Sequence, residues 1–148
     1  MPFPRVMVAI DGSACGARAL QVAATLATAL SAQIGLAHVI DPKLVIDSGI
    51  PVDQMWAILR REGQELLDTA ATAIPAHPHP WKFLREGPPA QELLAAAREW
   101  HAALIVLGTH GRSGVTRLLL GSTAEAVLRH APCPVVIVPT SAAMEEGA

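Results

Sequence analysis

The chain has 148 residues, of which 51% are hydrophobic and 16% are charged, with a formal net charge of −2. This length suits one domain, and the apolar content is ample for a packed core. Because the chain has no basic excess, we expect neither nucleic acid nor an anionic membrane surface as a partner.

Two further features bear on the cellular compartment. The N-terminal residues MPFPRVMVAI lack the charged and apolar regions of a signal peptide, and no apolar run reaches the ~20 residues that cross a bilayer. The two cysteines, Cys15 and Cys133, are too far apart to form a CxxC or metal-binding motif. We therefore expect a cytoplasmic protein with reduced thiols.

Short apolar runs alternate with alanine-rich helical stretches, a pattern typical of an α/β fold with a parallel sheet. The predicted strands, in chain order, are Arg5–Ile10, Ile34–Val39, Trp81–Arg85, Leu104–Leu107 and Val135–Val138. The predicted helices are Ser13–Leu30, Val52–Thr72, Pro89–His101 and Ser122–His130. The third strand alternates apolar and charged residues, which favours an outer position in the sheet.

Two connecting segments are predicted to be loops. Asp41–Pro51 follows the second strand and could fold over a ligand, and the proline-rich Ile74–Pro80 cannot be helix interior. No internal repeat or second domain is visible. We expect one domain over residues 1–140, followed by a small acidic tail at 141–148 that frays.

The most informative segment runs from Gly108 to Pro139. The apolar strand before it ends at Leu107, and the segment then places Gly108, Gly111 and the pair Gly121-Ser122 ahead of a helix. Backbone N–H groups converge where a strand leads through a glycine loop to a helix N-terminus, and the helix dipole adds positive potential. This arrangement predicts an anion-binding site.

The spacing Gly108-x2-Gly111-x9-Gly121-Ser122 resembles the ATP-binding signature of the universal stress protein family. VMVAIDGS at 6–13 and PCPVVIVP at 132–139 are similar to the family's opening and closing strands, so the resemblance extends from Arg5 to Pro139. It implies a single-domain α/β fold: an open, Rossmann-like five-stranded parallel sheet of the adenine nucleotide alpha hydrolase type, in the order 3-2-1-4-5, with helices on both faces. Ligands of such sheets bind where the strand order reverses, here between strands one and four.

The resemblance also implies an ATP-binding stress-response protein, regulatory or protective, with Mg²⁺ as an optional ion that bridges the phosphates. The adenosine end is expected at Ala9, Asp11 and Val39, with Gly12 and Ser13 in the adjoining turn. The phosphates are expected over the glycine signature and the helix that follows it, at Gly108, His110, Gly111, Arg112, Gly114, Gly121, Ser122 and Thr123.

Several of these residues also have a purely structural interpretation. The glycines suit an ordinary turn that leaves a strand. Residues 122–125, with the sequence Ser-Thr-Ala-Glu, form a capping box with Ser122 as N-cap, and we expect Ser122 both to cap the helix and to contact phosphate. Asp11 or Ser13 could cap the first helix, although ligand contact is favoured for Asp11.

The histidines outside the signature carry less information. His38 lies within the second strand and is more typical of a satisfied core or lining residue than of a ligand. His77 and His79 have no carboxylate or thiolate alongside, so no metal site is predicted there. The three tryptophans are interpreted as packing or interface anchors.

No enzymatic motif is found. GxGxxG after the first strand, GxxxxGK[ST] and Gx-Ser-xG are all missing, which leaves at most slow ATP hydrolysis. One alternative is a stress-family interaction module that binds no nucleotide. An adenylating or electron-transfer relative would need catalytic residues that the sequence does not show.

The apolar last strand, Val135–Val138, would form an edge, and the resemblance implies that it pairs with its copy in a homodimer.

Overall fold

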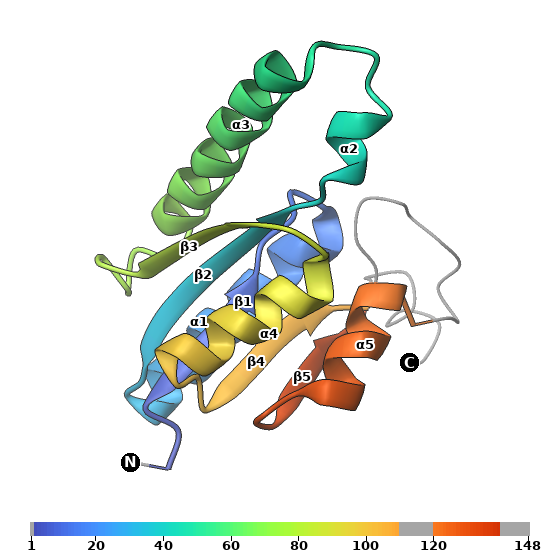
Figure 1. Ribbon diagram of the computed structural model, residues 1–148. Helices are drawn as coiled ribbons and strands as arrows, with labels where there is room; N and C mark the ends of the chain where they lie inside the picture. Colours follow the sequence, from blue (N-terminus) through green and yellow to red (C-terminus); the bar gives the residue numbers. More distant parts are fainter. Residues whose placement is uncertain (1, 110–119, 140–148) are drawn as a thin grey trace.

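The computed structural model describes residues 2–109 and 120–139. Its five strands are β1 Arg5–Ala9, β2 Gln33–Ile40, β3 Trp81–Glu86, β4 Leu104–Gly108 and β5 Val135–Val138. Its helices are α1 Ala14–Leu30, α2 Lys43–Ile46, α3 Val52–Thr72, α4 Pro89–Trp100 and α5 Ser122–His130. The strands form one parallel sheet in the order β3-β2-β1-β4-β5 (Figure 1), which confirms the predicted fold.

The segment Asp41–Pro51 is not entirely a loop, because it contains the short helix α2. The Asp41 carboxylate accepts a hydrogen bond from the Lys43 N–H at 3.0 Å and so starts the turn. Val45 is 3% exposed and packs with Ile40 and Leu59, which fixes α2 against the end of the sheet. Four residues are too few for helical periodicity to be visible in a sequence.

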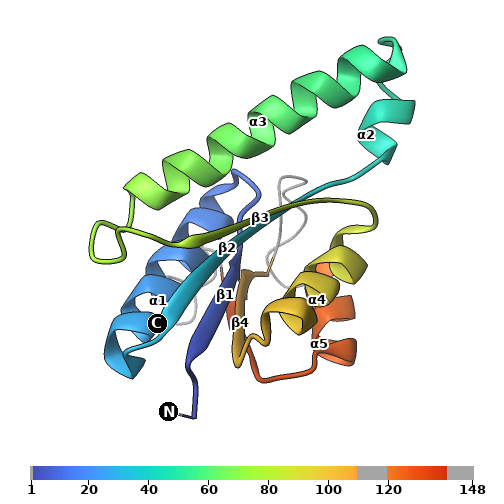
Figure 2. The same ribbon diagram turned by 60° about the vertical axis from the view of Figure 1, so that its left-hand side comes forward.

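Two apolar cores lie on opposite faces of the sheet. Figure 2 shows α1 and α3 on one side and α4 and α5 on the other. Successive side chains of a strand point to opposite faces, so Val6 and Val8 of β1 pack towards α1, whereas Met7 packs towards α4. All three are fully buried. Burial on both faces explains the continuous apolar runs of β1 and β4.

β3 forms one edge of the sheet, as its alternating sequence predicted. Its charged residues make ion pairs with the neighbouring helices: Lys82 with Asp68 of α3 at 2.9 Å, and Arg85 with Glu99 of α4 at 2.6 Å. Charged residues on an edge strand discourage pairing with other chains. None of the described helices combines the length and the apolar character that a membrane span requires.

Candidate functional site

The turn after β1 is held by a small hydrogen-bond network. One carboxylate oxygen of Asp11 accepts hydrogen bonds from the N–H and the hydroxyl of Ser13, at 2.9 and 2.6 Å. The Ser13 hydroxyl oxygen in turn accepts from the Gly16 N–H at 2.9 Å, so Ser13 is the N-cap of α1. A Cβ on Gly16 would lie 2.4 Å from the same Asp11 oxygen. The sequence around Asp11 therefore fixes its carboxylate at the end of β1.

Gly108 at the end of β4 is packed against the start of α1. A Cβ at this position would lie 2.5 Å from Cys15 Sγ and 3.2 Å from the Cys15 carbonyl carbon. The Cys15 thiol also donates a hydrogen bond to the Val138 carbonyl at 3.3 Å. The first glycine of the signature thus has a packing role: it lets α1 approach β4 and β5 closely.

Backbone hydrogen bonds hold the two ends of the glycine signature together. The Gly121 N–H donates to the Thr109 carbonyl at 2.7 Å, and the Thr109 N–H donates to the Val138 carbonyl at 3.0 Å. The Gly121 N–H is therefore already engaged within the protein. This finding differs from the expectation that it would be offered to a phosphate.

The predicted capping box at residues 122–125 is wrong. Gly121 is the N-cap of α5 and makes no side-chain cap, and Glu125 pairs with Arg129 at 2.8 Å instead of reaching back. Ser122 is already the first helical residue. The first intrahelical bond runs from the Glu125 N–H to the Gly121 carbonyl, so the N–H groups of residues 122–124 precede the helical ladder. They lie at the positive end of the α5 dipole.

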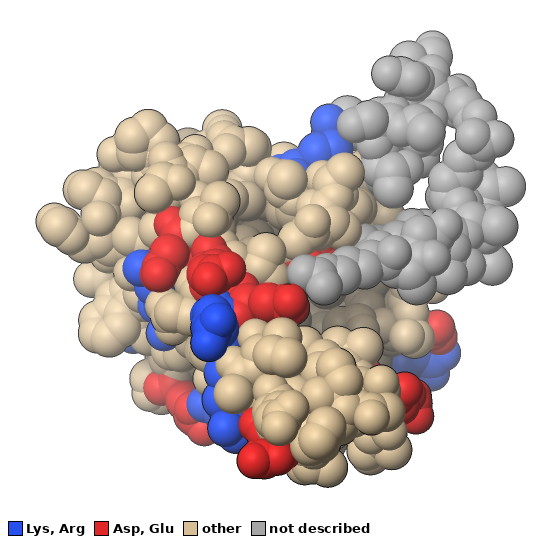
Figure 3. Space-filling model, turned by 90° about the horizontal axis from the view of Figure 1, so that it is seen from above, with Lys and Arg blue, Asp and Glu red and all other residues tan. Residues whose placement is uncertain are grey.

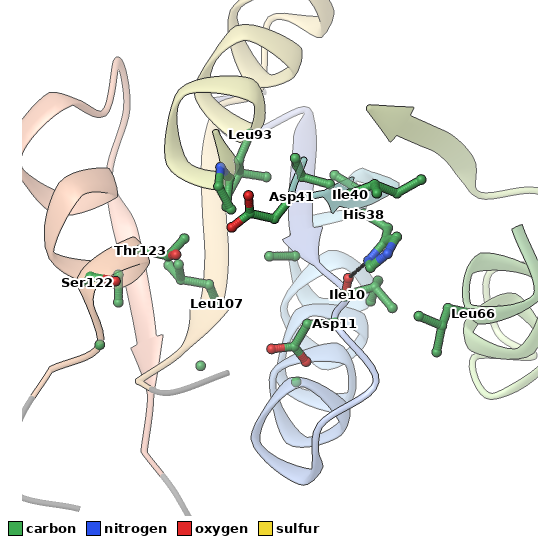
Figure 4. Close-up of a pocket in the computed structure, with 18 of the residues that line it drawn as sticks. Ile10, Asp11, His38, Ile40, Asp41, Leu66, Leu93, Leu107, Ser122 and Thr123 are labelled. Carbon is green, nitrogen blue, oxygen red and sulfur yellow. Dashed lines mark hydrogen bonds between the residues drawn. The ribbon is translucent and has the colours of Figure 1, made fainter. Parts of the chain in front are cut away.

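A cavity of about 430 Å³ opens where these segments meet, at the carboxyl ends of β1, β2 and β4. The close-up in Figure 4 shows Leu93, Leu107, Ser122 and Thr123 on one side of the end of β1, and His38 and Leu66 on the other. The cavity lies at the switch in strand order between β1 and β4, which is where open α/β sheets bind ligands. Its volume suits a small organic molecule.

The charged side chains that line the cavity, among the described residues, are all acidic: Asp11, Asp41 and Glu62. Acidic side chains also gather near the middle of this end of the molecule in Figure 3. Carboxylates at the ends of β1 and β2 would accept hydrogen bonds from hydroxyl or amino groups of a ligand. An anionic group of a ligand is better placed at the N-terminus of α5.

The structure brings most of the described candidate residues together. Those that line the cavity are Ala9, Asp11, Val39, Gly108, Gly121, Ser122 and Thr123. Gly12 has a positive φ of 82° and shapes the turn, whereas Ser13 caps α1; neither is among the described lining residues. The candidates His110, Gly111, Arg112 and Gly114 lie outside the described residues.

The sequence did not point to the apolar residues of the helices that line the cavity. Pro89 and Leu93 of α4, and Leu59 and Leu66 of α3, contribute to its walls. Their helical spacing indicates only a buried face, since cavity-lining and core residues share the same periodicity. His38 is a lining residue, as expected, and its Nδ1 lies 2.6 Å from the Ile10 carbonyl oxygen.

Comparisons with known proteins agree with this architecture. The model of the universal stress protein family matches residues 2–139. A universal stress protein of Thermus aquaticus is 36% identical over 137 residues, which cover 92% of this chain and 98% of that protein. The solved structure of hypothetical protein MJ0577 has a TM-score of 0.82 and 21% identity, over 93% of this chain and 96% of that one. A universal stress protein solved in complex with cAMP has a TM-score of 0.64 and 28% identity, and the match covers 94% of this chain and 98% of that one.

Proposed function

The chain belongs to the universal stress protein family, and from that premise we propose that its cavity binds an adenine nucleotide, with ATP as the ligand. The observation that carries the proposal is the position of the cavity, between the carboxyl ends of β1 and β4 and beside the first turn of α5. The similar protein solved with cAMP supports an adenine nucleotide as the class of ligand.

In the proposed complex the adenine ring lies on the α4 side of the sheet. Ala9 and Val39 form its strand wall, and Leu93 of α4 lies opposite them. These side chains are apolar, which suits the faces of a purine ring. The carboxylate of Asp11 would accept hydrogen bonds from the ribose hydroxyls.

The phosphates extend in the proposed complex towards α5. The N–H groups of Ser122 and Thr123, and the Ser122 hydroxyl, are donors at the positive end of this helix. Mg²⁺ is an optional ion in the proposal and would neutralise part of the phosphate charge. The bound nucleotide would tie α5 to the ends of β1 and β2, and a partner protein would then recognise the filled form.

We place this function in the cytoplasm, where free thiols such as Cys15 and Cys133 remain reduced.

We also propose that the protein forms a homodimer through β5. This strand is the sheet edge opposite β3, and Val135, Val136 and Ile137 are only partly buried. An apolar edge strand with unpaired backbone groups favours pairing with another strand. The same strand from a second copy would continue the sheet and cover these side chains.

The test of nucleotide binding starts from the protein as purified. Denaturation releases bound small molecules, and ion-exchange chromatography against ATP, ADP and AMP standards identifies them. We expect an adenine nucleotide in a fraction of the molecules, and ATP to remain ATP during hours of incubation with Mg²⁺. Protein that is folded, nucleotide-free and unable to take up added ATP would instead support an interaction module that acts through its dimer surface.

A further inference from the structure

The cavity extends beyond the proposed nucleotide site, to the opposite face of the sheet. Alternate residues of a strand face opposite sides, so Ala37 and Val39 face α4 whereas His38 and Ile40 face α3. Figure 4 shows His38 pointing away from Leu93 and towards Leu66. We call the second part the α3 lobe, and its lining residues are Ile10, His38, Ile40, Leu59, Glu62 and Leu66.

The walls of the α3 lobe are mostly apolar. Ile10, Ile40 and Leu59 are buried, and Leu66 lies on the face of α3 that looks towards them. A glycine inside a helix costs about 1 kcal/mol relative to alanine, and α3 has one at Gly63. A Cβ there would lie 3.0 Å from the His38 ring, so the glycine lets α3 sit directly against that ring.

The contact of His38 with the Ile10 carbonyl determines which of its ring nitrogens is an acceptor. Its Nδ1 lies 2.6 Å from the Ile10 carbonyl oxygen, and because a carbonyl only accepts, Nδ1 must carry the hydrogen. In the neutral ring Nε2 is then an acceptor. Within the part of the chain that the structure describes, no group donates a hydrogen bond to Nε2. The α3 lobe therefore combines apolar walls with an acceptor.

The charge around the α3 lobe selects the ligand further. Glu62 is exposed at its mouth, whereas the Asp41 carboxylate points towards Leu93 on the α4 side of the cavity. No lysine or arginine is among the described lining residues. Negative potential at the mouth attracts cations and repels carboxylates and phosphates. A ligand of this lobe thus needs an apolar body and a donor or cationic head.

We propose that the α3 lobe binds a small organic amine. Its apolar body lies between Leu59 and Leu66, and its ammonium group is held by Glu62, with His38 Nε2 as a further acceptor. This site lies on the other face of the sheet from the proposed adenine site. A molecule that occupied it would contact α3 and the end of β2 and leave α5 untouched, so amine and nucleotide could be bound together.

The experiment is an NMR titration of ¹⁵N-labelled protein with n-hexylamine, with hexanoate as the probe of the same length and opposite charge. We expect saturable shifts for the backbone amides of β2 and α3 with hexylamine and none with hexanoate. Equal binding of the two probes, or no binding of hexylamine, would overturn the proposal. Neither result bears on the nucleotide, because ATP binding is measured in a separate titration.

Two variants that fill the cavity separate its two parts. Leu66→Trp should abolish hexylamine binding and leave ATP affinity unchanged, whereas Ala9→Leu should abolish ATP binding and leave hexylamine binding unchanged. The exposed change Glu62→Gln keeps the fold, and it should weaken hexylamine binding by up to about fivefold, as expected for a partly screened ion pair. Hexylamine affinity that is the same in the wild type, Leu66→Trp and Glu62→Gln would contradict the assignment.

Discussion

Asp11 and Ser13 are joined by two hydrogen bonds to a single carboxylate oxygen, one from the Ser13 N–H at 2.9 Å and one from its hydroxyl at 2.6 Å. The residue that faces the cavity and the residue that caps α1 thus form one unit. The structural interpretation of Asp11, as part of a helix cap, is therefore compatible with its functional interpretation as a ligand contact. The cap of α1 orients its carboxylate towards the position that the proposed complex gives to the ribose.

Asp11→Asn should weaken ATP binding by about tenfold or more, since a hydrogen bond to a charged group is worth about 1.5–3 kcal/mol. Ser13→Ala is the matched control: it keeps the carboxylate but removes the cap, and should cost about 1 kcal/mol of stability. Isothermal titration calorimetry and urea denaturation measure the two quantities. If both variants lost the same affinity, the geometry of the turn rather than the charge of Asp11 would be the determinant.

Gly108→Ala should destabilise the fold by about 1–3 kcal/mol, which is typical of an overpacked core. The reason is the 2.5 Å approach of the added Cβ to Cys15 Sγ. Cys15→Ala removes that sulfur, so the double variant should lose less than the sum of the two single changes. Additive losses, measured by urea denaturation, would mean that the backbone around Gly108, and not its contact with Cys15, requires glycine.

The proposed dimer predicts different outcomes for proline substitutions at two neighbouring positions of β5. The Pro134 carbonyl accepts a hydrogen bond from Ile105 of β4, and the Val138 carbonyl accepts one from Thr109, which follows β4. Alternate residues of a strand face the same neighbour, so Val136 also faces β4 and Ile137 turns its N–H to the open edge. Ile137→Pro should therefore give a folded monomer, whereas Val136→Pro should break the pairing with β4 and destabilise the domain.

Size-exclusion chromatography with light scattering, together with circular dichroism, distinguishes these outcomes. If the folded Ile137→Pro variant remained a dimer, β5 would not be the dimer interface.

The ion pair between Arg85 and Glu99 predicts a pH dependence of stability. The Arg85 guanidinium lowers the pKa of the Glu99 carboxyl in the folded protein, chiefly through their hydrogen bonds. A lowered folded pKa contributes stability above the unfolded value of about 4.3, and this contribution is lost as the pH falls through the folded pKa. Urea denaturation should find Glu99→Gln less stable than wild type at pH 7, and the difference should shrink as the pH falls below the unfolded value of about 4.3. If the difference stayed constant down to pH 3, the lower stability of Glu99→Gln would come from lost packing and not from the ion pair.

The strands and long helices could be predicted because their periodicity is strong. The alternation in Trp81–Arg85 indicated an outer strand, and the continuous apolar runs indicated strands covered on both faces. The order of the strands came from the family resemblance, because periodicity contains no information on which strands pair. Helix α2 was missed because Lys43–Ile46 is a single turn held by Asp41 and by the burial of Val45.

The candidate site could be predicted only in part. The glycine signature marks the end of β4 and the start of α5, and Asp11 marks the end of β1. The capping box failed because a pattern of residue types does not determine where a helix starts: Gly121 takes the N-cap position, and Glu125 has a better partner in Arg129. The α3 lobe depends on how α3 packs against His38, a contact between residues that are far apart in sequence.

The most direct test of the central claim is a calorimetric titration of nucleotide-free protein with ATP, with Gly121→Val as the paired variant. Valine at the N-cap of α5 adds a branched side chain to the cavity beside Ser122 and Thr123. We predict saturable binding with one ATP per chain in the wild type, and its loss in a variant that keeps its circular dichroism spectrum. Absence of binding in the folded wild type, or unchanged binding in the variant, would contradict the assignment of the cavity as a nucleotide site.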